Sequence, residues 1–319
     1  MKALVFDKEL NFVTDYPKPI PQKGEALIKV THAGICNTDV EITRGYMGFK
    51  GICGHEFLGV VEEVNAEDKS LLGKRVTGEI NLGCGNCPDC YNNMQRHCKN
   101  RQTLGIYKKD GIFAEYVTLP LENIVEIPDN VPDSDAILIE PLAAALEILE
   151  QVHIKPADKI AVLGDGKLGL LISLVLSTTP AELVTIGKHD NKLDILKKQG
   201  IKTKYLQDTT ETKYYDIVVD ATGSADGFEK AVSLVKPRGI FVLKSTVAAE
   251  KPMNLAPIVI DEITVVGSRC GQFRPALRLL EKNVLDLEPL VSKTFNFNDA
   301  LEAFNYAQEK GVLKVILKF

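Results

Sequence analysis

From Lys159 onward the sequence alternates short apolar strands with amphipathic helical stretches, and this alternation limits the possible fold more than any other feature. The pattern runs KIAVL then KLGLLISLVL, ELVTI then NKLDILKKQG, and DIVVDATG then GFEKAVSLV, before GIFVL and EITVV. Such alternation is typical of βαβ units, whose strands form a parallel sheet covered by helices. We therefore predict an α/β fold with a doubly wound parallel sheet in this part of the chain.

One connection in this pattern is short. Between Gly200 and Asp216 lie about fifteen residues, which must hold the strand IKTKYL and the polar run QDTTETK. A full crossover helix does not fit after that strand, because parallel strands are ordinarily joined by a dozen or more residues. We expect one truncated crossover in the sheet.

The residues before this region are rich in β-branched strands, such as ALIKVTHA, FLGVVEEV and RVTGEI, separated by turn clusters. The end of the chain returns to mixed texture and finishes in the apolar strand VLKVILKF. We predict a discontinuous β-rich domain, residues 1–142 and 269–319, around a dinucleotide-binding domain of residues 143–268.

Composition excludes several classes of protein. The 319 residues carry a net charge of −5, which gives no basic surface for nucleic acid. The first residues, MKALVFDKEL, lack the apolar segment of a signal peptide, and no apolar run is long enough to span a membrane. Seven cysteines without an export signal favour reduced thiols and metal binding over disulfides. We expect a cytoplasmic protein that binds neither nucleic acid nor membrane.

The run GCGNCPDCYNNMQRHC places four cysteines at the spacing of a closed zinc site. Two-residue gaps let consecutive thiolates converge on one ion, and four sulfurs complete a tetrahedral shell. A zinc ribbon that docks nucleic acid uses similar spacing, but this loop offers no basic face. We predict a structural zinc held by Cys84, Cys87, Cys90 and Cys98.

The motif GDGKLG, residues 164–169, follows an apolar strand and opens a helix, which is the context of a dinucleotide-binding loop. Gly164 permits the tight turn, Gly166 lets the backbone approach a pyrophosphate, and Gly169 lets helix pack on strand. The helix N-terminus, at Lys167 and Leu168, then offers free N–H groups to the phosphates. Asp165 is expected to point away from them.

The end of the next strand bears on the choice of nucleotide. An NAD site normally has an acidic residue there, which binds the ribose 2′-hydroxyl and repels a 2′-phosphate. Here the strand runs into Gly187, Lys188 and His189, with Asp190 three positions late and Lys192 nearby. A glycine leaves room and cations replace the anion, which favours NADP over NAD. The same residues could also form an ordinary solvated helix cap, with Asp190 as N-cap and Lys188 exposed, and the two interpretations are compatible.

A second, dispersed set of candidate metal ligands comprises Cys36, His55, Glu56 and Glu140. Taken singly, Cys36 could be a small core residue and His55 a satisfied core histidine. A catalytic zinc, however, needs three protein ligands of mixed type and one open position. We interpret Cys36 and His55 with one carboxylate as that site, and Cys53 as a neighbouring thiol that lines it.

The ordered set GIC-x-TD, GHE, the four-cysteine loop, EPL and GxGxxG resembles the zinc-containing alcohol dehydrogenases of the medium-chain dehydrogenase/reductase superfamily. The polyol, threonine and glucose dehydrogenase branch is more similar, because Glu140 stands where other branches have cysteine. The resemblance implies a GroES-like β-rich catalytic domain and a Rossmann domain. It also implies two zinc ions, one catalytic and one structural, and a homodimer or homotetramer.

Further roles follow from the same resemblance. Asp39 stands where the family holds the ligand histidine, Thr38 where a hydroxyl passes on the alcohol proton, and Glu41 where many relatives end a proton relay with histidine. Lys314 replaces an arginine that supports the cofactor phosphates. The remaining candidate cofactor contacts are Thr222, Gly223 and Arg269.

We therefore expect reversible oxidation of a small alcohol or polyol to its carbonyl by hydride transfer to NADP or NAD. Two alternatives stay open. A zinc-free quinone or enoyl reductase of the same superfamily would hold no catalytic zinc, and a non-catalytic NADP-binding protein on this fold would show no turnover.

Overall fold

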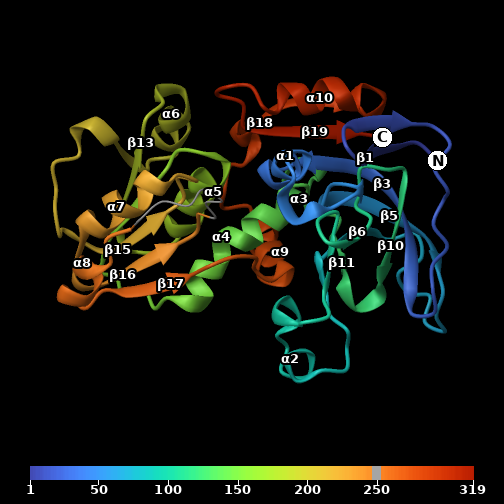
Figure 1. Ribbon diagram of the computed structural model, residues 1–319, viewed down its shortest axis with the longest axis horizontal. Helices are drawn as coiled ribbons and strands as arrows, with labels where there is room; N and C mark the ends of the chain where they lie inside the picture. Colours follow the sequence, from blue (N-terminus) through green and yellow to red (C-terminus); the bar gives the residue numbers. More distant parts are fainter. Residues whose placement is uncertain (246–252) are drawn as a thin grey trace. The chain divides into compact units, whose positions relative to one another are not determined.

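The computed structural model describes residues 1–245 and 253–319, which form two compact units. The first comprises Met1–Glu140 with Phe273–Phe319, and the second comprises Pro141–Gln272. Helix α4 (Ile139–Gln151) carries the chain from the first unit into the second (Figure 1). Within the described ranges, no helix has both the length and the hydropathy that crossing a membrane would need.

The first unit is built around one large sheet in the order β11-β6-β5-β3-β19-β18, with β10 also paired to β3. Long, alternately buried strands such as β3 form it because β-branched residues pack well on a pleated surface. The strands are β3 (Glu25–Ile35), β5 (Glu56–Val64), β6 (Arg75–Gly78), β10 (Tyr116–Pro120), β11 (Ile124–Glu126), β18 (Val291–Asn296) and β19 (Lys314–Lys318).

Two small sheets and short helices complete this unit. The sheets have the orders β2-β1-β4 and β7-β8-β9. Their strands are β1 (Ala3–Phe6), β2 (Leu10–Val13), β4 (Gly51–Ile52), β7 (Asn81–Leu82), β8 (Gln102–Leu104) and β9 (Lys108–Lys109). The helices are α1 (Asn37–Thr43), α2 (Pro88–Tyr91), α3 (Asp133–Ala136), α9 (Phe273–Glu281) and α10 (Ala300–Tyr306). Single 3-10 turns span Tyr46–Gly48, Gln95–His97, Leu121–Asn123, Glu288–Leu290 and Phe297–Asp299.

Strand pairing at the centre of the large sheet positions the site described below. Near the end of β3, Gly34 lies opposite Glu56 of β5, and Ile35 lies opposite Val315 of β19. The first residues of β5 and β19 therefore flank the last residues of β3. Segments that are far apart in sequence meet at this point.

The second unit is a six-stranded parallel sheet in the order β14-β13-β12-β15-β16-β17. Its strands are β12 (Lys159–Leu163), β13 (Glu182–Gly187), β14 (Lys202–Tyr205), β15 (Tyr215–Asp220), β16 (Val235–Leu243) and β17 (Thr264–Gly267). Its other helices are α5 (Lys167–Leu176), α6 (Asp190–Lys198), α7 (Ala225–Leu234) and α8 (Ala256–Ile260). Helices α5 and α6 pack on β12, β13 and β14, and α7 packs on β15 and β16 (Figure 1).

The predicted doubly wound parallel sheet is confirmed, and so is its truncated crossover. Between β14 and β15 the chain forms only a 3-10 turn, Leu206–Asp208, where the other connections carry helices. The core on the α7 face is apolar and includes Phe228 and Phe241, whose ring centroids lie 5.3 Å apart. Burial of such large rings stabilises this face of the sheet.

Candidate active site

The four predicted cysteine ligands come together at one point of the first unit. Their sulfurs all lie within 4.8 Å of one another, and Cys87 Sγ is 3.6 Å from Cys90 Sγ and 3.7 Å from Cys98 Sγ. A tetrahedron with Zn–S bonds of about 2.3 Å has edges of about 3.8 Å. The loop folds this way because the short helix α2 begins with Pro88 directly after Cys87, so that Cys87 and Cys90 face each other. The backbone N–H of Cys84 is the main reason that the pKa of Cys98 falls to about 7, whereas burial raises the pKa of Cys90 to about 11.

A second cluster contains Cys36, His55 and Glu56, whose potential ligand atoms also lie within 4.8 Å of one another. Cys36 directly follows β3, and Glu56 begins β5 opposite Gly34. His55 and Glu56 are almost completely buried. The three ligand types, sulfur, imidazole nitrogen and carboxylate oxygen, are those of a catalytic zinc with one open position.

Asp39 lies next to this cluster. Its carboxylate accepts hydrogen bonds from the backbone N–H of Cys36 at 2.8 Å and of Gly54 at 3.2 Å. Its Oδ1 also lies 3.2 Å from Nδ1 of His55. Burial alone would lower the pKa of His55, but the Asp39 carboxylate raises it well above its usual value. Such a carboxylate fixes the tautomer and ring orientation of a ligand histidine.

Lys314 contacts this cluster directly. As the first residue of β19 it reaches across β3, and its ammonium forms an ion pair with Oε2 of Glu56. Burial would lower the pKa of Lys314, but the charges of Glu56, Cys36 and Glu140 raise it, so the side chain stays charged. The sequence indicated only a phosphate-binding lysine here, and it gave no sign that Glu56 is its partner.

The other predicted residues of this region lie in different settings. Thr38 Oγ1 is 3.7 Å from Cys36 Sγ, within the first turn of α1. Glu41 lies on the exposed side of α1, where it forms an ion pair with Arg44 at 2.9 Å. Glu140 is not grouped with Cys36 and His55, whereas Glu56 is. Cys53 is fully buried, burial raises the pKa of its thiol, and it is not grouped with Cys36, His55 and Glu56.

These residues fit zinc on two further observations. One oxygen of Glu56, Oε1, is buried and has no hydrogen-bond partner, which is costly unless a cation or solvent satisfies it. The donor set is also the mixture that zinc binds, without the all-oxygen shell that calcium or magnesium prefers.

In the second unit the glycine-rich loop has the geometry predicted for each glycine. Gly164 has φ +113°, and a Cβ there would lie 2.6 Å from the Ala221 carbonyl oxygen. A Cβ on Gly169 would lie 2.1 Å from the Gly164 carbonyl oxygen, so helix and strand pack closely. Gly166 faces open space and is the N-cap of α5, as a loop that cradles phosphate requires.

The end of β13 differs from the expectation in one respect. Gly187 was expected to leave room at this strand end, but the carboxylate of Asp165 fills that room. A Cβ on Gly187 would lie 2.6 Å from Asp165 Oδ2. Asp165 accepts hydrogen bonds from the backbone N–H of Lys188 at 2.6 Å and of His189 at 2.7 Å. The N-cap of α6 is His189, so the alternative with Asp190 as N-cap is wrong.

The remaining predicted cofactor contacts are spread over the same unit. Thr222 and Gly223 follow β15, where the Thr222 hydroxyl donates to Asp220 at 2.7 Å and Gly223 N–H donates to Ser245 Oγ at 2.8 Å. Lys192 lies in α6, and Lys188, which precedes this helix, is exposed. Arg269 follows β17, and its carbonyl oxygen accepts a hydrogen bond from Lys244.

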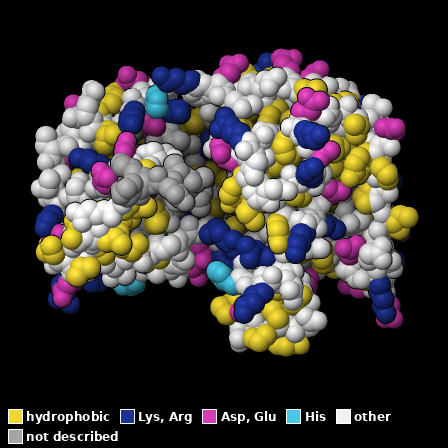
Figure 2. All heavy atoms as spheres, in the orientation of Figure 1, with side chains coloured by type: hydrophobic (Ala, Val, Ile, Leu, Met, Phe, Trp, Pro, Cys, Tyr) yellow, Lys and Arg dark blue, Asp and Glu magenta, His cyan; other side chains and the backbone are white. Residues whose placement is uncertain are grey.

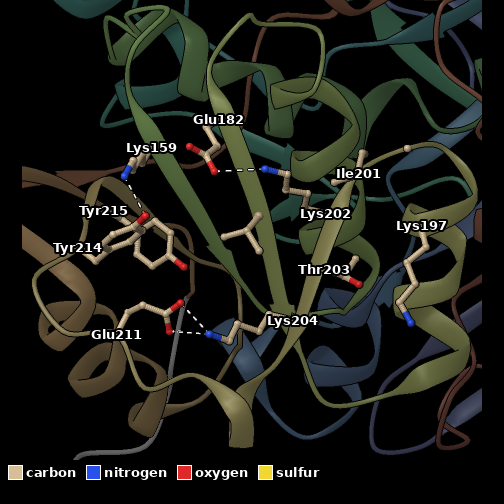
Figure 3. A pocket seen from close by; sticks show the side chains of 12 residues that line it. Lys159, Glu182, Lys197, Ile201, Lys202, Thr203, Lys204, Glu211, Tyr214 and Tyr215 are labelled. Carbon is tan, nitrogen blue, oxygen red and sulfur yellow. Dashed lines mark hydrogen bonds and ion pairs between the residues drawn. The ribbon is translucent and has the colours of Figure 1, made fainter.

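A cavity of about 600 Å³ lies where the truncated crossover leaves the sheet uncovered. Figure 3 shows Lys159, Glu182, Lys202 and Tyr214 around it, with ion pairs joining Glu182 to Lys202 and Glu211 to Lys204. Lys159, Glu182 and Lys202 are the first residues of their strands. Nucleotides bind at the carboxyl ends of parallel strands, where the glycine loop lies, so this cavity is distinct from the predicted cofactor site.

Known proteins match both units. The model of the alcohol dehydrogenase GroES-like domain matches residues 22–129, and that of the zinc-binding dehydrogenase matches residues 168–282. Sorbitol dehydrogenase of Halalkalibacterium halodurans is 28% identical over 96% of this chain and 94% of that protein. L-threonine 3-dehydrogenase of Shewanella frigidimarina is 26% identical over the full length of both.

Solved structures agree with this result. An alcohol dehydrogenase of Escherichia coli CFT073 complexed with NADH has a TM-score of 0.91 and 26% identity, covering 100% of this chain and 99% of that chain. A zinc-binding dehydrogenase of Sinorhizobium meliloti 1021 bound to NADP has a TM-score of 0.91 and 25% identity, with the same coverage. The predicted resemblance is confirmed, and the protein is an NAD(P)-dependent oxidoreductase. The chain belongs to the zinc-containing alcohol dehydrogenases of the medium-chain dehydrogenase/reductase superfamily.

Proposed function

We propose that this enzyme holds two zinc ions, a catalytic one at Cys36, His55 and Glu56 and a structural one at the four-cysteine loop. The observation that carries this proposal is the convergence of three mixed ligands on one buried point, with the Asp39 carboxylate 3.2 Å from Nδ1 of the histidine. Glu56 is favoured over Glu140 as third ligand because only Glu56 lies in the cluster. We propose the domain limits predicted from the sequence, 1–142 with 269–319 and 143–268, which differ from the limits of the two compact units by two residues at the first boundary and four at the second.

When bound at this cluster, zinc would act as a Lewis acid and lower the pKa of a substrate hydroxyl. The protein's own residues would then orient the alcohol and move its proton. We propose that Thr38 accepts that proton, because its hydroxyl lies 3.7 Å from Cys36 Sγ. Glu41 pairs with Arg44 at the surface, so we propose it only as a later acceptor toward solvent. Lys314 fixes the orientation of Glu56.

We propose that the nucleotide binds along the glycine loop, with its phosphates at Gly166 and the N-terminus of α5. Lys188 and Lys192, on either side of His189, favour NADP over NAD, because they place cations beyond the end of β13. Known relatives of this chain have been solved with either nucleotide. The preference is therefore a property to be measured for this chain.

The substrate is proposed to be a small polyol or secondary alcohol. This follows from the relatives, which include a sorbitol dehydrogenase and threonine 3-dehydrogenases. A screen of polyols, amino alcohols and simple secondary alcohols with both nucleotides tests the class. Failure to oxidise or reduce any of them would exclude this class of substrates.

We also propose that the enzyme forms a homodimer or homotetramer in the cytoplasm. Large apolar side chains on α8 and β17, among them Val259, Ile260 and Val265, are exposed. Figure 2 shows hydrophobic side chains gathered at the lower left, in the region of α8. An apolar patch beside an unpaired strand edge is a common site of association. Sedimentation velocity would give the number of copies.

Zinc content is the decisive measurement for the catalytic site. Two zinc ions per chain by mass spectrometry of metal, falling to one in Cys36→Ala, are the expected result. One zinc per chain in the active wild-type enzyme would instead favour the zinc-free quinone or enoyl reductase.

A further inference from the structure

We propose that Asp165 is a specificity-determining residue that opposes the 2′-phosphate of NADP and keeps NAD usable. Its carboxylate, supplied by the glycine loop, stands where an NAD site ordinarily has an acid from the end of the second strand. The inference rests on the proposed nucleotide site and concerns only how that site chooses between two cofactors.

The position of the carboxylate is closely defined. Its Oδ2 accepts the backbone N–H of Lys188 at 2.6 Å and of His189 at 2.7 Å, and the His189 ring nitrogen Nδ1 lies 3.1 Å from both carboxylate oxygens. These contacts join the glycine loop to the loop after β13. The carboxylate therefore lies at the strand end itself, although Asp165 precedes Gly187 by 22 positions in the sequence.

Gly187 and Asp165 form a matched pair. A Cβ on Gly187 would stand 2.6 Å from Asp165 Oδ2 and 2.7 Å from Asp165 Cβ, closer than real Cβ atoms approach. A side chain at position 187 would thus displace the carboxylate. An acidic side chain at position 187 and the carboxylate of Asp165 cannot occupy this space together. In this chain the carboxylate comes from Asp165.

The carboxylate is charged at neutral pH. Burial would raise the pKa of Asp165, but the two backbone N–H groups and His189 outweigh burial and lower it. Asp165 also changes the local balance of charge, because it adds a fixed anion at the strand end that Lys188 and His189 follow. Asp165 therefore offsets part of the positive charge that Lys188 and Lys192 offer to a 2′-phosphate, and its carboxylate cannot move away because three donors hold it.

The test compares dissociation constants for NADPH and NADH, measured by nucleotide fluorescence at one ionic strength, in the zinc-loaded wild type and in Asp165→Asn. An asparagine can still accept both backbone N–H groups through its carbonyl, so mainly the charge is lost. We expect the ratio of NADH to NADPH dissociation constants to rise about tenfold, through tighter NADPH binding. Asp165→Ala, which removes charge and hydrogen bonds, should move the ratio in the same direction.

The matched control is Asp190→Asn, which makes the same change of net charge at an exposed carboxylate three residues beyond Gly187. Its ratio should change less than twofold. An unchanged ratio in both Asp165 variants, or a shift toward NADH, would overturn the inference. A larger shift in Asp190→Asn than in Asp165→Asn would also overturn it and assign the role to Asp190. If the wild type bound neither nucleotide, the proposed function itself would fail, which is a distinct result.

Discussion

The four-cysteine cluster takes all its ligands from residues 84–98, whereas the Cys36–His55–Glu56 cluster takes its ligands from the ends of two paired strands. The first is held by a loop with one short helix and one 3-10 turn. The second depends on the register of the large sheet, on Asp39 beneath it, and on Lys314 from β19.

This difference has a physical consequence. A local loop with four sulfurs can close around zinc and exclude other ligands, and its folding free energy then comes largely from the metal. A cluster assembled by the sheet is positioned before metal arrives, so its geometry can keep one position open. Local construction thus suits stability, and construction by the whole sheet suits catalysis.

The largest expected effect is loss of turnover on removal of a sheet-borne ligand. Cys36→Ala and His55→Ala should each lower kcat/KM by at least about 10,000-fold, because Lewis-acid activation of the hydroxyl is lost. The four-cysteine zinc and the melting temperature should be retained. Steady-state kinetics with metal analysis measure both, and Cys53→Ala, a buried thiol outside the cluster, is the control. Retained turnover in both variants would exclude these residues as ligands of a catalytic zinc.

Removal of a ligand from the four-cysteine loop should instead lower the stability of the protein. Cys98→Ser should reduce the free energy of unfolding by about 4 kcal/mol, because a buried thiolate ligand of the structural zinc is removed. Denaturant unfolding and metal analysis would show one zinc lost while the Cys36 cluster keeps its own. If the variant lost turnover yet kept full stability, the functions assigned to the two clusters would have to be exchanged.

A third test concerns the pair of Lys314 and Glu56. Lys314→Met should destabilise the zinc-depleted protein by about 3 kcal/mol, since it leaves the buried Glu56 without its cation. The double variant Lys314→Met/Glu56→Gln should recover much of this loss. Equal destabilisation in the single and double variants would show that packing, not charge, is the function of Lys314. Lys314→Arg is the charge-conserving control.

The smallest effect is expected at Asp39. Asp39→Asn should weaken zinc binding at the catalytic cluster by about 10–100-fold, because the amide no longer holds the His55 ring as a carboxylate does. Competition with a fluorescent chelator measures the affinity of each site. An equal change at the four-cysteine site would contradict a local role for Asp39.

Sequence analysis predicted best the features that depend on short segments of the chain. The parallel sheet follows from runs such as KIAVL, and the truncated crossover follows from the short segment before Asp216. The glycine loop was equally clear, because each glycine serves a local backbone requirement. The four-cysteine cluster also depends on spacing alone.

Contacts between segments that are far apart in the sequence were harder to predict. The Lys314–Glu56 pair spans 258 positions and depends on β3 lying between β5 and β19, which no local pattern reveals. Asp165 was expected only to avoid the phosphates, since its contact with the end of β13 depends on how two loops meet. The combination of an acid in the glycine loop with a glycine at the next strand end is the signal that could have indicated it.

The two edges of the parallel sheet are also unlike. The edge strand β14 has the sequence KTKY, so lysines recur along it, whereas β17, TVVG, carries no charge and lies beside the exposed apolar residues of α8. Among the described strands, none pairs with the outer side of β17. Charged edges resist the addition of further strands and neutral edges permit it. Two copies joined symmetrically through β17 would thus leave a lysine-bearing β14 at each end of the shared sheet, and growth of that sheet would stop at two subunits.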